Sequence, residues 1–266
     1  MNIDNQLGQL NISNGVSLRE DAIVKAPQQK FVPDSFQRGI YVTAPKKTFA
    51  ALSSINAAYS PNQLLNAYLN PSYLKFLVDT NPNIQNMLNE HGLEGKIYPE
   101  NISKISKSHI TSTTAIARQI ANQLNISQAD KQILEQACVF HDFGKVLIPK
   151  EILLKPSQLS DSEKEIMDLH AELGAELLST TGMNSRVTDL VRNHHDNNAE
   201  NADILGQILS VADIYSALRE ERSYKASVSE EDALSLLDQK AQNGEVSAEA
   251  VDALKASLSA KSVYTE

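Results

Sequence analysis

The sequence predicts an all-α protein, a helical bundle preceded by a small, mainly helical N-terminal module. Beyond about residue 100, apolar side chains recur at helical spacing, and the alternation typical of strands nearly disappears. Residues that cap helices stand before these segments, as Ser160 does with Glu163 three positions later. Between residues 49 and 100, Pro61, Pro71 and Pro82 each follow a Ser or Asn that can cap a short helix.

These observations divide the chain into three parts. Residues 1–48 carry scattered prolines and polar side chains and are expected to form an irregular arm. Residues 49–100 form the small helical module, for which a regulatory role is one interpretation. Residues 101–266 are expected to form a larger helical domain. Within it we expect helices over 105–124, 127–140, 160–177, 203–218, 229–237 and 247–258.

Composition limits the classes of partner and location. The chain has 266 residues, of which 41% are apolar, enough for a core, and a formal net charge of -9 without clustered Lys or Arg. This charge argues against nucleic acid as a partner. Cys138 is the single cysteine, which excludes an intramolecular disulfide and a cysteine-based zinc site, and we expect it to be a buried apolar filler. Residues 1–15 lack the features of a signal or anchor, so we expect no membrane association and a cytoplasmic location.

Histidine and aspartate side chains are concentrated in one half of the chain. The adjacent pair His141-Asp142 follows an apolar helical segment, and Asp213 stands at the end of the apolar stretch 204–212, where an unpaired carboxylate would be costly. Imidazole and carboxylate groups together suit divalent transition metals, and an aspartate can bridge two ions. The pattern therefore predicts a dinuclear metallohydrolase. Its candidate ligands are His109, His141, Asp142, His170, His194, His195 and Asp213.

From about residue 108 to residue 258, ordered motifs resemble those of one superfamily. They are 138–145 (CVFHDFGK), 152–160 (ILLKPSQLS), His170 ahead of Gly174, the pair His194-His195, 211–218 (VADIYSAL), 222–225 (RSYK) and 231–234 (EDAL). In these motifs the chain resembles the HD-domain superfamily of metal-dependent phosphohydrolases. Within that superfamily it is similar to the HD-GYP phosphodiesterases that hydrolyse cyclic di-GMP. Matches in order over such a length are more specific than one short motif.

The resemblance implies an HD-type bundle and assigns roles to its residues. One metal ion would be held by His109, His141, Asp142 and Asp213, and the second by Asp142 as a bridge with His170, His194 and His195. The ions implied are iron or manganese, although zinc and nickel accept the same ligands. Metal-hydroxide attack on a phosphodiester would involve Asp142 and Lys145 as catalytic residues. Lys145, Arg222 and Lys225 would contact the substrate phosphate. The expected substrate is a small anionic cyclic dinucleotide.

Two departures from the family pattern keep alternatives open. Ile105 occupies the position of the Glu that precedes the first His in three-metal members, so a third metal is not expected. The loop after His194-His195 is short and lacks the Gly-Tyr-Pro signature. An HD-type nucleotide phosphomonoesterase or pyrophosphohydrolase is therefore a second hypothesis, and a catalytically silent sensor or scaffold is a third. Residues 219–222 could instead be a solvated helix end, and residues 1–100 could mediate a homodimer or bind a regulatory partner.

Overall fold

The structure is a computed structural model that describes residues 60–98, 101, 107–196, 203–220 and 227–262. Within these residues it is all-helical, as the sequence predicts, and contains no strand. The predicted arm at residues 1–48 lies outside the described part. The described residues all belong to one compact unit that spans residues 52–266. The division of the chain near residue 100 stays a prediction.

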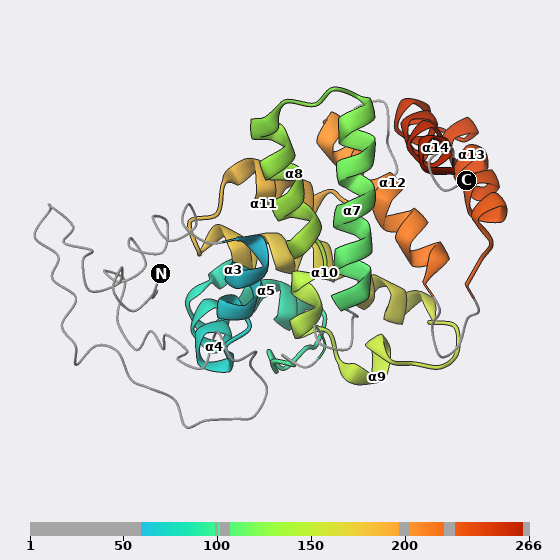
Figure 1. The fold of residues 1–266 in the computed structure, drawn as a ribbon. Coiled ribbons are helices and arrows are strands. Elements are labelled where there is room, and N and C mark those ends of the chain that lie inside the picture. The colour runs from blue at the N-terminus through green and yellow to red at the C-terminus, as the bar shows by residue number, and fades with distance from the viewer. Residues whose placement is uncertain (1–59, 99–100, 102–106, 197–202, 221–226, 263–266) are drawn as a thin grey trace, which may run out of the picture. The chain divides into compact units, whose positions relative to one another are not determined.

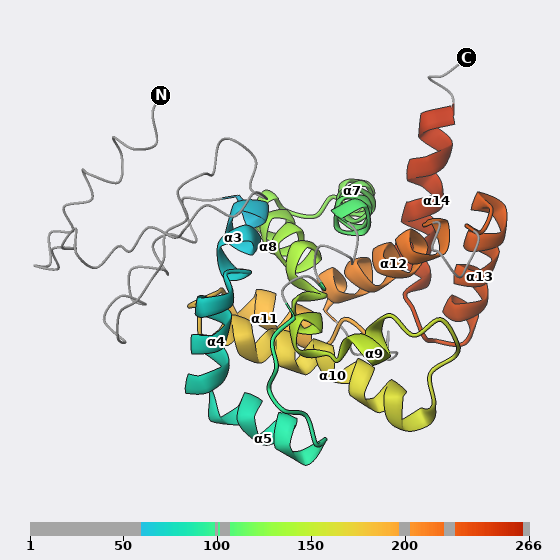
Figure 2. The ribbon, with the colours of Figure 1, turned by 90° about the horizontal axis from the view of Figure 1, so that it is seen from below.

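In the described part of the chain, three short helices come first, and each begins as its proline predicts. They are α3 (Pro61–Tyr68), α4 (Pro71–Thr80) and α5 (Pro82–Glu90). The cap residues Ser60, Asn70 and Asn81 each accept hydrogen bonds from backbone N–H groups of the first turn. Such bonds satisfy amides that have no partner inside the helix. These helices lie beside α8 (Gln128–Phe140) and α10 (Asp161–Ser179) (Figure 2).

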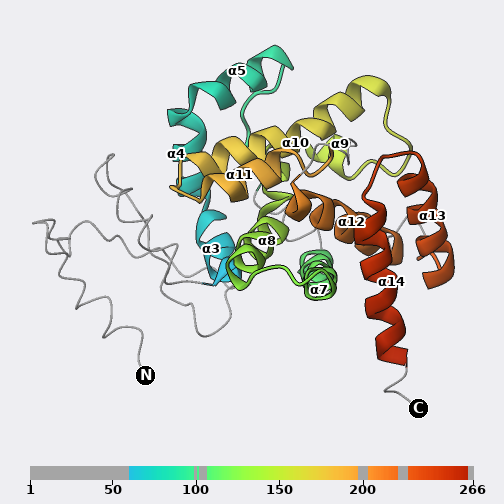
Figure 3. The same ribbon diagram turned by 90° about the horizontal axis from the view of Figure 1, so that it is seen from above.

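The remaining helices form the bundle that the sequence predicts (Figure 1). Its first half consists of α7 (Lys107–Gln123), α8 (Gln128–Phe140), the 3-10 turn η3 (Phe143–Leu147), α9 (Lys150–Leu153) and α10 (Asp161–Ser179). Its second half consists of α11 (Ser185–Arg192), α12 (Ile204–Arg219), α13 (Glu230–Gln242) and α14 (Ala248–Ser262). Helix α12 packs against α7 and α8, while α10 packs against α11 and η3. Helices α13 and α14 lie side by side next to α12 (Figure 3).

An aromatic cluster fixes the end of α8, where the His-Asp pair lies. The Tyr68 ring of α3 lies 5.7 Å from Phe140 and 6.3 Å from Phe143, measured between ring centroids. All three side chains are buried. Because Phe140 and Phe143 flank the pair, burial of the two rings holds His141 and Asp142 from both sides. Cys138 is also fully buried in this region, as the sequence predicts.

Candidate metal centre

The His-Asp pair lies in the tight connection between α8 and η3, directly against α10. Gly144 makes this contact possible, since a Cβ atom at Gly144 would lie 2.0 Å from the carbonyl oxygen of His170 and 2.6 Å from the backbone nitrogen of Gly174. Glycine therefore permits a backbone approach that no other residue allows. The approach brings the turn that carries Asp142 next to the helix that carries His170.

A first group of ligand atoms joins three helices. His109 on α7, His141 at the end of α8 and Asp213 on α12 offer ligand atoms that all lie within 4.8 Å of one another. His109 Nε2 is 2.9 Å from Asp213 Oδ1, and His141 Nε2 is 3.5 Å from the same oxygen. Both imidazoles are buried, and the Asp213 side chain is 14% exposed. The group has the ligand types and spacing that one divalent ion requires.

A second group contains imidazoles alone. His170 on α10 and His194 and His195 after α11 offer nitrogens within 4.8 Å of one another. His170 Nε2 is 3.3 Å from His194 Nε2 and 3.2 Å from His195 Nε2. His170 and His194 are buried, whereas His195 is exposed. The second group is therefore open to solvent on the His195 side.

Asp142 lies between the two groups. Its Oδ2 is 3.5 Å from His141 Nε2 in the first group, and its Oδ1 is 3.5 Å from His170 Nε2 in the second. The side chain is almost completely buried. The structure thus brings all seven sequence-predicted ligand residues together, with Asp142 where a bridging carboxylate would stand.

Backbone hydrogen bonds orient three of the imidazoles in a way that indicates whether metal ions fit between the two groups. The Nδ1 atoms of His141, His170 and His194 lie 2.6–2.8 Å from the carbonyl oxygens of Cys138, Met167 and Val191, in each case three residues earlier. A carbonyl can only accept, so each Nδ1 donates a proton, and each ring in its neutral form directs the Nε2 lone pair toward the centre. His141 Nε2 is buried without a hydrogen-bond partner. Backbone carbonyls hold metal-ligating histidines in the same way, and the donors present therefore fit divalent cations.

The pKa shifts of the histidines differ between the two groups of candidate ligands. Burial lowers the pKa of His170 to about 3, and burial with the neighbouring imidazoles His195 and His170 holds the pKa of His194 well below its usual range. These rings are neutral, as ligands must be. Burial also disfavours the charged form of His141, but the nearby carboxylates outweigh burial and raise its pKa to about 9. A proton therefore competes with a metal ion for His141.

The two carboxylates are ionised in spite of burial. Burial would raise the pKa of Asp142, but Lys145 and the adjacent imidazoles hold it well below its usual range. The hydrogen bond from His109 and the nearby His141 imidazole likewise outweigh burial and hold the pKa of Asp213 well below its usual range. The centre therefore presents two anionic ligands at neutral pH.

Of the three basic residues predicted to contact the substrate phosphate, the structure describes one. Lys145 Nζ lies 2.7 Å from Asp142 Oδ1, and its side chain is 19% exposed. Without a ligand, Lys145 thus serves as counter-charge to Asp142, at a point from which it faces the centre. Arg222 and Lys225 lie outside the described residues, and their phosphate role stays a prediction.

Sequence reasoning did not identify Glu220 as part of the centre. Its Oε1 accepts a 2.8 Å hydrogen bond from Ser108 Oγ, and its Oε2 lies 3.8 Å from His109 Nδ1. Glu220 is thus a largely buried residue behind the first group rather than part of a solvated helix end. Its position directly after the charged end of α12 gave no signal of this role, because the contact joins residues 112 positions apart.

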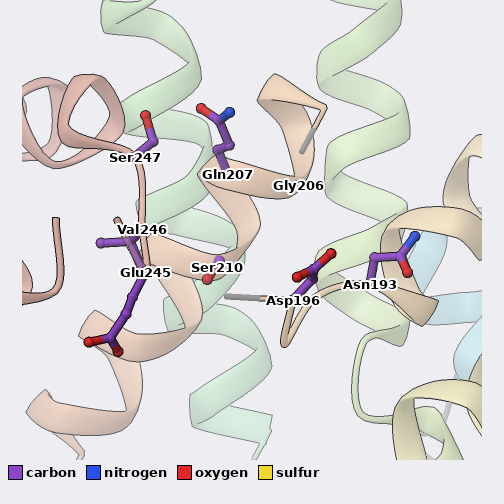
Figure 4. A pocket seen from close by; sticks show the side chains of 8 residues that line it. All are labelled: Asn193, Asp196, Gly206, Gln207, Ser210, Glu245, Val246 and Ser247. Carbon is purple, nitrogen blue, oxygen red and sulfur yellow. The ribbon is translucent and has the colours of Figure 1, made fainter. Parts of the chain in front are cut away.

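A separate small pocket lies beside the double histidine (Figure 4). Asn193 and Asp196 from the turn after α11 form one side, and Gln207 and Ser210 of α12 form another. The full lining is Asn193, Asp196, Gly206, Gln207, Ser210, Glu245, Val246 and Ser247. None of the seven predicted ligands lines it, so this pocket is distinct from the metal centre.

Comparisons with known proteins agree with this geometry. Residues 107–218 match the family model described as HD domain. Over 136 residues the chain is 34% identical to the cyclic di-GMP phosphodiesterase response regulator RpfG of Xanthomonas campestris, which covers 46% of this chain and 35% of the relative. It is 28% identical over 135 residues to the 3'3'-cGAMP-specific phosphodiesterase 2 of Vibrio cholerae, which covers 46% of this chain and 26% of the relative.

Among solved structures, the fold is similar to Bd1817, a HDG"Y"P protein from Bdellovibrio bacteriovorus. The TM-score is 0.50 at 15% sequence identity, and the match covers 80% of this chain and 67% of the other. The chain spans roughly a quarter to a third of the length of RpfG and of the Vibrio cholerae phosphodiesterase 2. Residues 107–218, which match the HD domain model, contain all seven candidate ligands. Through residues 107–218 the chain is therefore similar to the HD domain family.

Proposed function

We propose that the protein is a metal-dependent phosphodiesterase that hydrolyses a cyclic dinucleotide, cyclic di-GMP or a related molecule. One observation carries the proposal: Asp142 stands between two groups of imidazole and carboxylate ligands, 3.5 Å from a nitrogen of each. The relatives named as cyclic di-GMP and 3'3'-cGAMP phosphodiesterases support the substrate class. A cytoplasmic location is part of the proposal, and no described helix is long and apolar enough to cross a bilayer.

The residues would hold two divalent cations, iron or manganese. His109, His141 and Asp213 would bind one, His170, His194 and His195 the other, and Asp142 both. When bound, the cations would supply Lewis acidity and lower the pKa of a water molecule between them. Two divalent ions against two carboxylates leave the centre positive, which favours an anionic phosphodiester.

The chain's own groups would position and stabilise the reacting phosphate. The backbone carbonyls behind His141, His170 and His194 keep their Nε2 atoms directed inward, so that no reorganisation is needed when substrate enters. The Lys145 ammonium is already within the centre. Once Asp142 binds cations, Lys145 would be free to contact a non-bridging phosphate oxygen, where negative charge increases during phosphoryl transfer.

One observation favours a second candidate. Only residues 196–203 separate the double histidine from α12, and the sequence there lacks Gly-Tyr-Pro. If a longer loop is required to hold a cyclic dinucleotide, the same centre would serve a nucleotide phosphomonoesterase or pyrophosphohydrolase instead.

The test is a substrate panel on anaerobically purified protein loaded with Mn²⁺ or Fe²⁺, after elemental analysis. Release of a linear dinucleotide from a cyclic one supports the main proposal. Free phosphate or nucleoside from nucleotides supports the second candidate. Asp142→Asn should abolish activity and weaken metal binding, whereas Asp252→Asn, which changes an aspartate that is 79% exposed on α14, should not. Bound metal with no turnover of any substrate would instead support a silent sensor.

A further inference from the structure

A buried asparagine outside the matched family region holds the turn that presents Asp142 and Lys145. Asn101 is fully buried, and its side-chain amide donates to the carbonyl oxygen of Lys145 at 2.7 Å and to that of Ile148 at 2.9 Å. Both amide protons are therefore used, on acceptors 44 and 47 positions away in the sequence. Neither the sequence nor any resemblance singles out this residue.

The contact acts on the end of η3, where the Lys145 carbonyl already accepts a hydrogen bond from the Ile148 backbone N–H at 3.2 Å and the Asn101 amide adds a second. Unsatisfied carbonyls at a helix end need donors, and a buried carbonyl without one is costly. A third bond comes from the same segment, since the Tyr98 backbone N–H donates to the Val146 carbonyl at 2.7 Å. The backbone N–H of Asn101 in turn donates to the Tyr98 carbonyl at 2.9 Å. Residues 98 and 101 thus donate hydrogen bonds to three carbonyls of the turn that ends at Ile148.

We propose that Asn101 is a positioning residue of the metal centre: by fixing the carbonyls of Lys145 and Ile148, it sets the placement of Asp142 and of the Lys145 ammonium. The effect passes through a short, stiff segment. Lys145 N–H donates to the Asp142 carbonyl at 3.0 Å, and Lys145 Nζ lies 2.7 Å from the Asp142 carboxylate. A change in the Lys145 backbone therefore moves both groups. The role in metal binding stands on this geometry, whereas its effect on turnover rests on the proposed function.

The side-chain chemistry is specific to an amide. Asp at position 101 would have nearly the same shape but would set acceptor oxygens against two carbonyl oxygens. Asn101→Asp thus reverses the interaction with little change in volume. Asn101→Ala removes it and serves as the second variant if the first does not fold.

The experiment compares these variants with Asn70→Ala, which removes the cap of α4 away from the centre. In metal-free protein, hydrogen exchange of residues 143–148 should accelerate in both Asn101 variants and not in Asn70→Ala. In Mn²⁺ titrations, the Asn101 variants should lose at least about tenfold in affinity, as changes behind metal ligands commonly do. Exchange and Mn²⁺ affinity equal to those of Asn70→Ala would overturn the proposal. Wild-type protein that binds Mn²⁺ but hydrolyses nothing would contradict the proposed function alone.

Discussion

Gly144 offers the sharpest test of how the fold builds the centre. In Gly144→Ala the added Cβ would lie 2.0 Å from the His170 carbonyl oxygen, whereas real Cβ atoms essentially never approach another atom closer than 3.0 Å. The conflicting atoms belong to the backbone, so no side-chain rotation relieves the overlap, and η3 and α10 must separate by about 1 Å. Overpacking of this kind costs about 1–3 kcal/mol, and we expect the upper end. At about 2–4 °C per kcal/mol for a chain of this size, the melting temperature should fall by about 6–12 °C.

The same separation should weaken metal binding, because His170 and Asp142 lie on opposite sides of the contact. Ligands need placement within about 0.5 Å, so we expect at least a tenfold loss of Mn²⁺ affinity by calorimetric titration. Gly206→Ala is the matched control: its Cβ would meet only Leu190 Cδ2 at 3.5 Å, and alanine favours the α12 helix by up to about 1 kcal/mol. A Gly144→Ala protein with wild-type melting temperature and Mn²⁺ affinity would refute the reasoning.

Three further outcomes follow from individual contacts. Lys145→Met should lower turnover at least tenfold while Mn²⁺ affinity is kept or raised, because the ammonium no longer competes for Asp142; Lys75→Met, in an exposed pair with Asp79, should change neither. Metal-free protein should lose thermal stability as pH falls below about 6.5, because His170 then binds a proton in the unfolded chain but, with a pKa of about 3, not in the folded one. His141 has the opposite effect, since its pKa is raised to about 9 in the folded protein. The stability that its protonation contributes is lost as pH rises from 6.5 to 9. Thermal melts from pH 5 to pH 9 should thus show a maximum near 6.5, and a curve that rises steadily toward pH 5 would contradict these assignments. Ser160→Ala should cost about 1 kcal/mol in denaturant unfolding by removing the cap of α10, and no change in the midpoint would argue against that cap.

Local signals explain why the helices could be predicted from the sequence. Caps such as Ser160 and Asn70 act within three or four residues, so the sequence contains both partners of each bond. The candidate metal ligands could be predicted for another reason. A carboxylate such as Asp213 in an apolar helix requires a partner, whichever segment of the chain supplies that partner. The family resemblance then supplied the order in which these residues meet.

Contacts between distant segments could not be predicted in this way. Glu220 meets Ser108 across 112 positions, and Asn101 meets Ile148 across 47, yet in the sequence both are ordinary polar residues. The importance of Gly144 likewise depends on the position of α10, which no local pattern specifies. Residues whose effect depends on the packing of two helices carry no periodic or motif signal of their own.

The charges of the centre explain how one fold can be stable before a metal ion binds and still accept one. Lys145 offsets Asp142, while the hydrogen bond from His109 and the nearby His141 imidazole offset Asp213, so neither buried carboxylate is left without compensation. An entering cation must therefore displace an ammonium from Asp142 and any proton from His141. Under the proposed function, Lys145 would then be free to contact a substrate phosphate, and a deprotonated His141 would offer its Nε2 lone pair as a ligand. The ion pair that would compete with a metal ion for Asp142 is thus the same interaction that would place the Lys145 ammonium beside a bound phosphate.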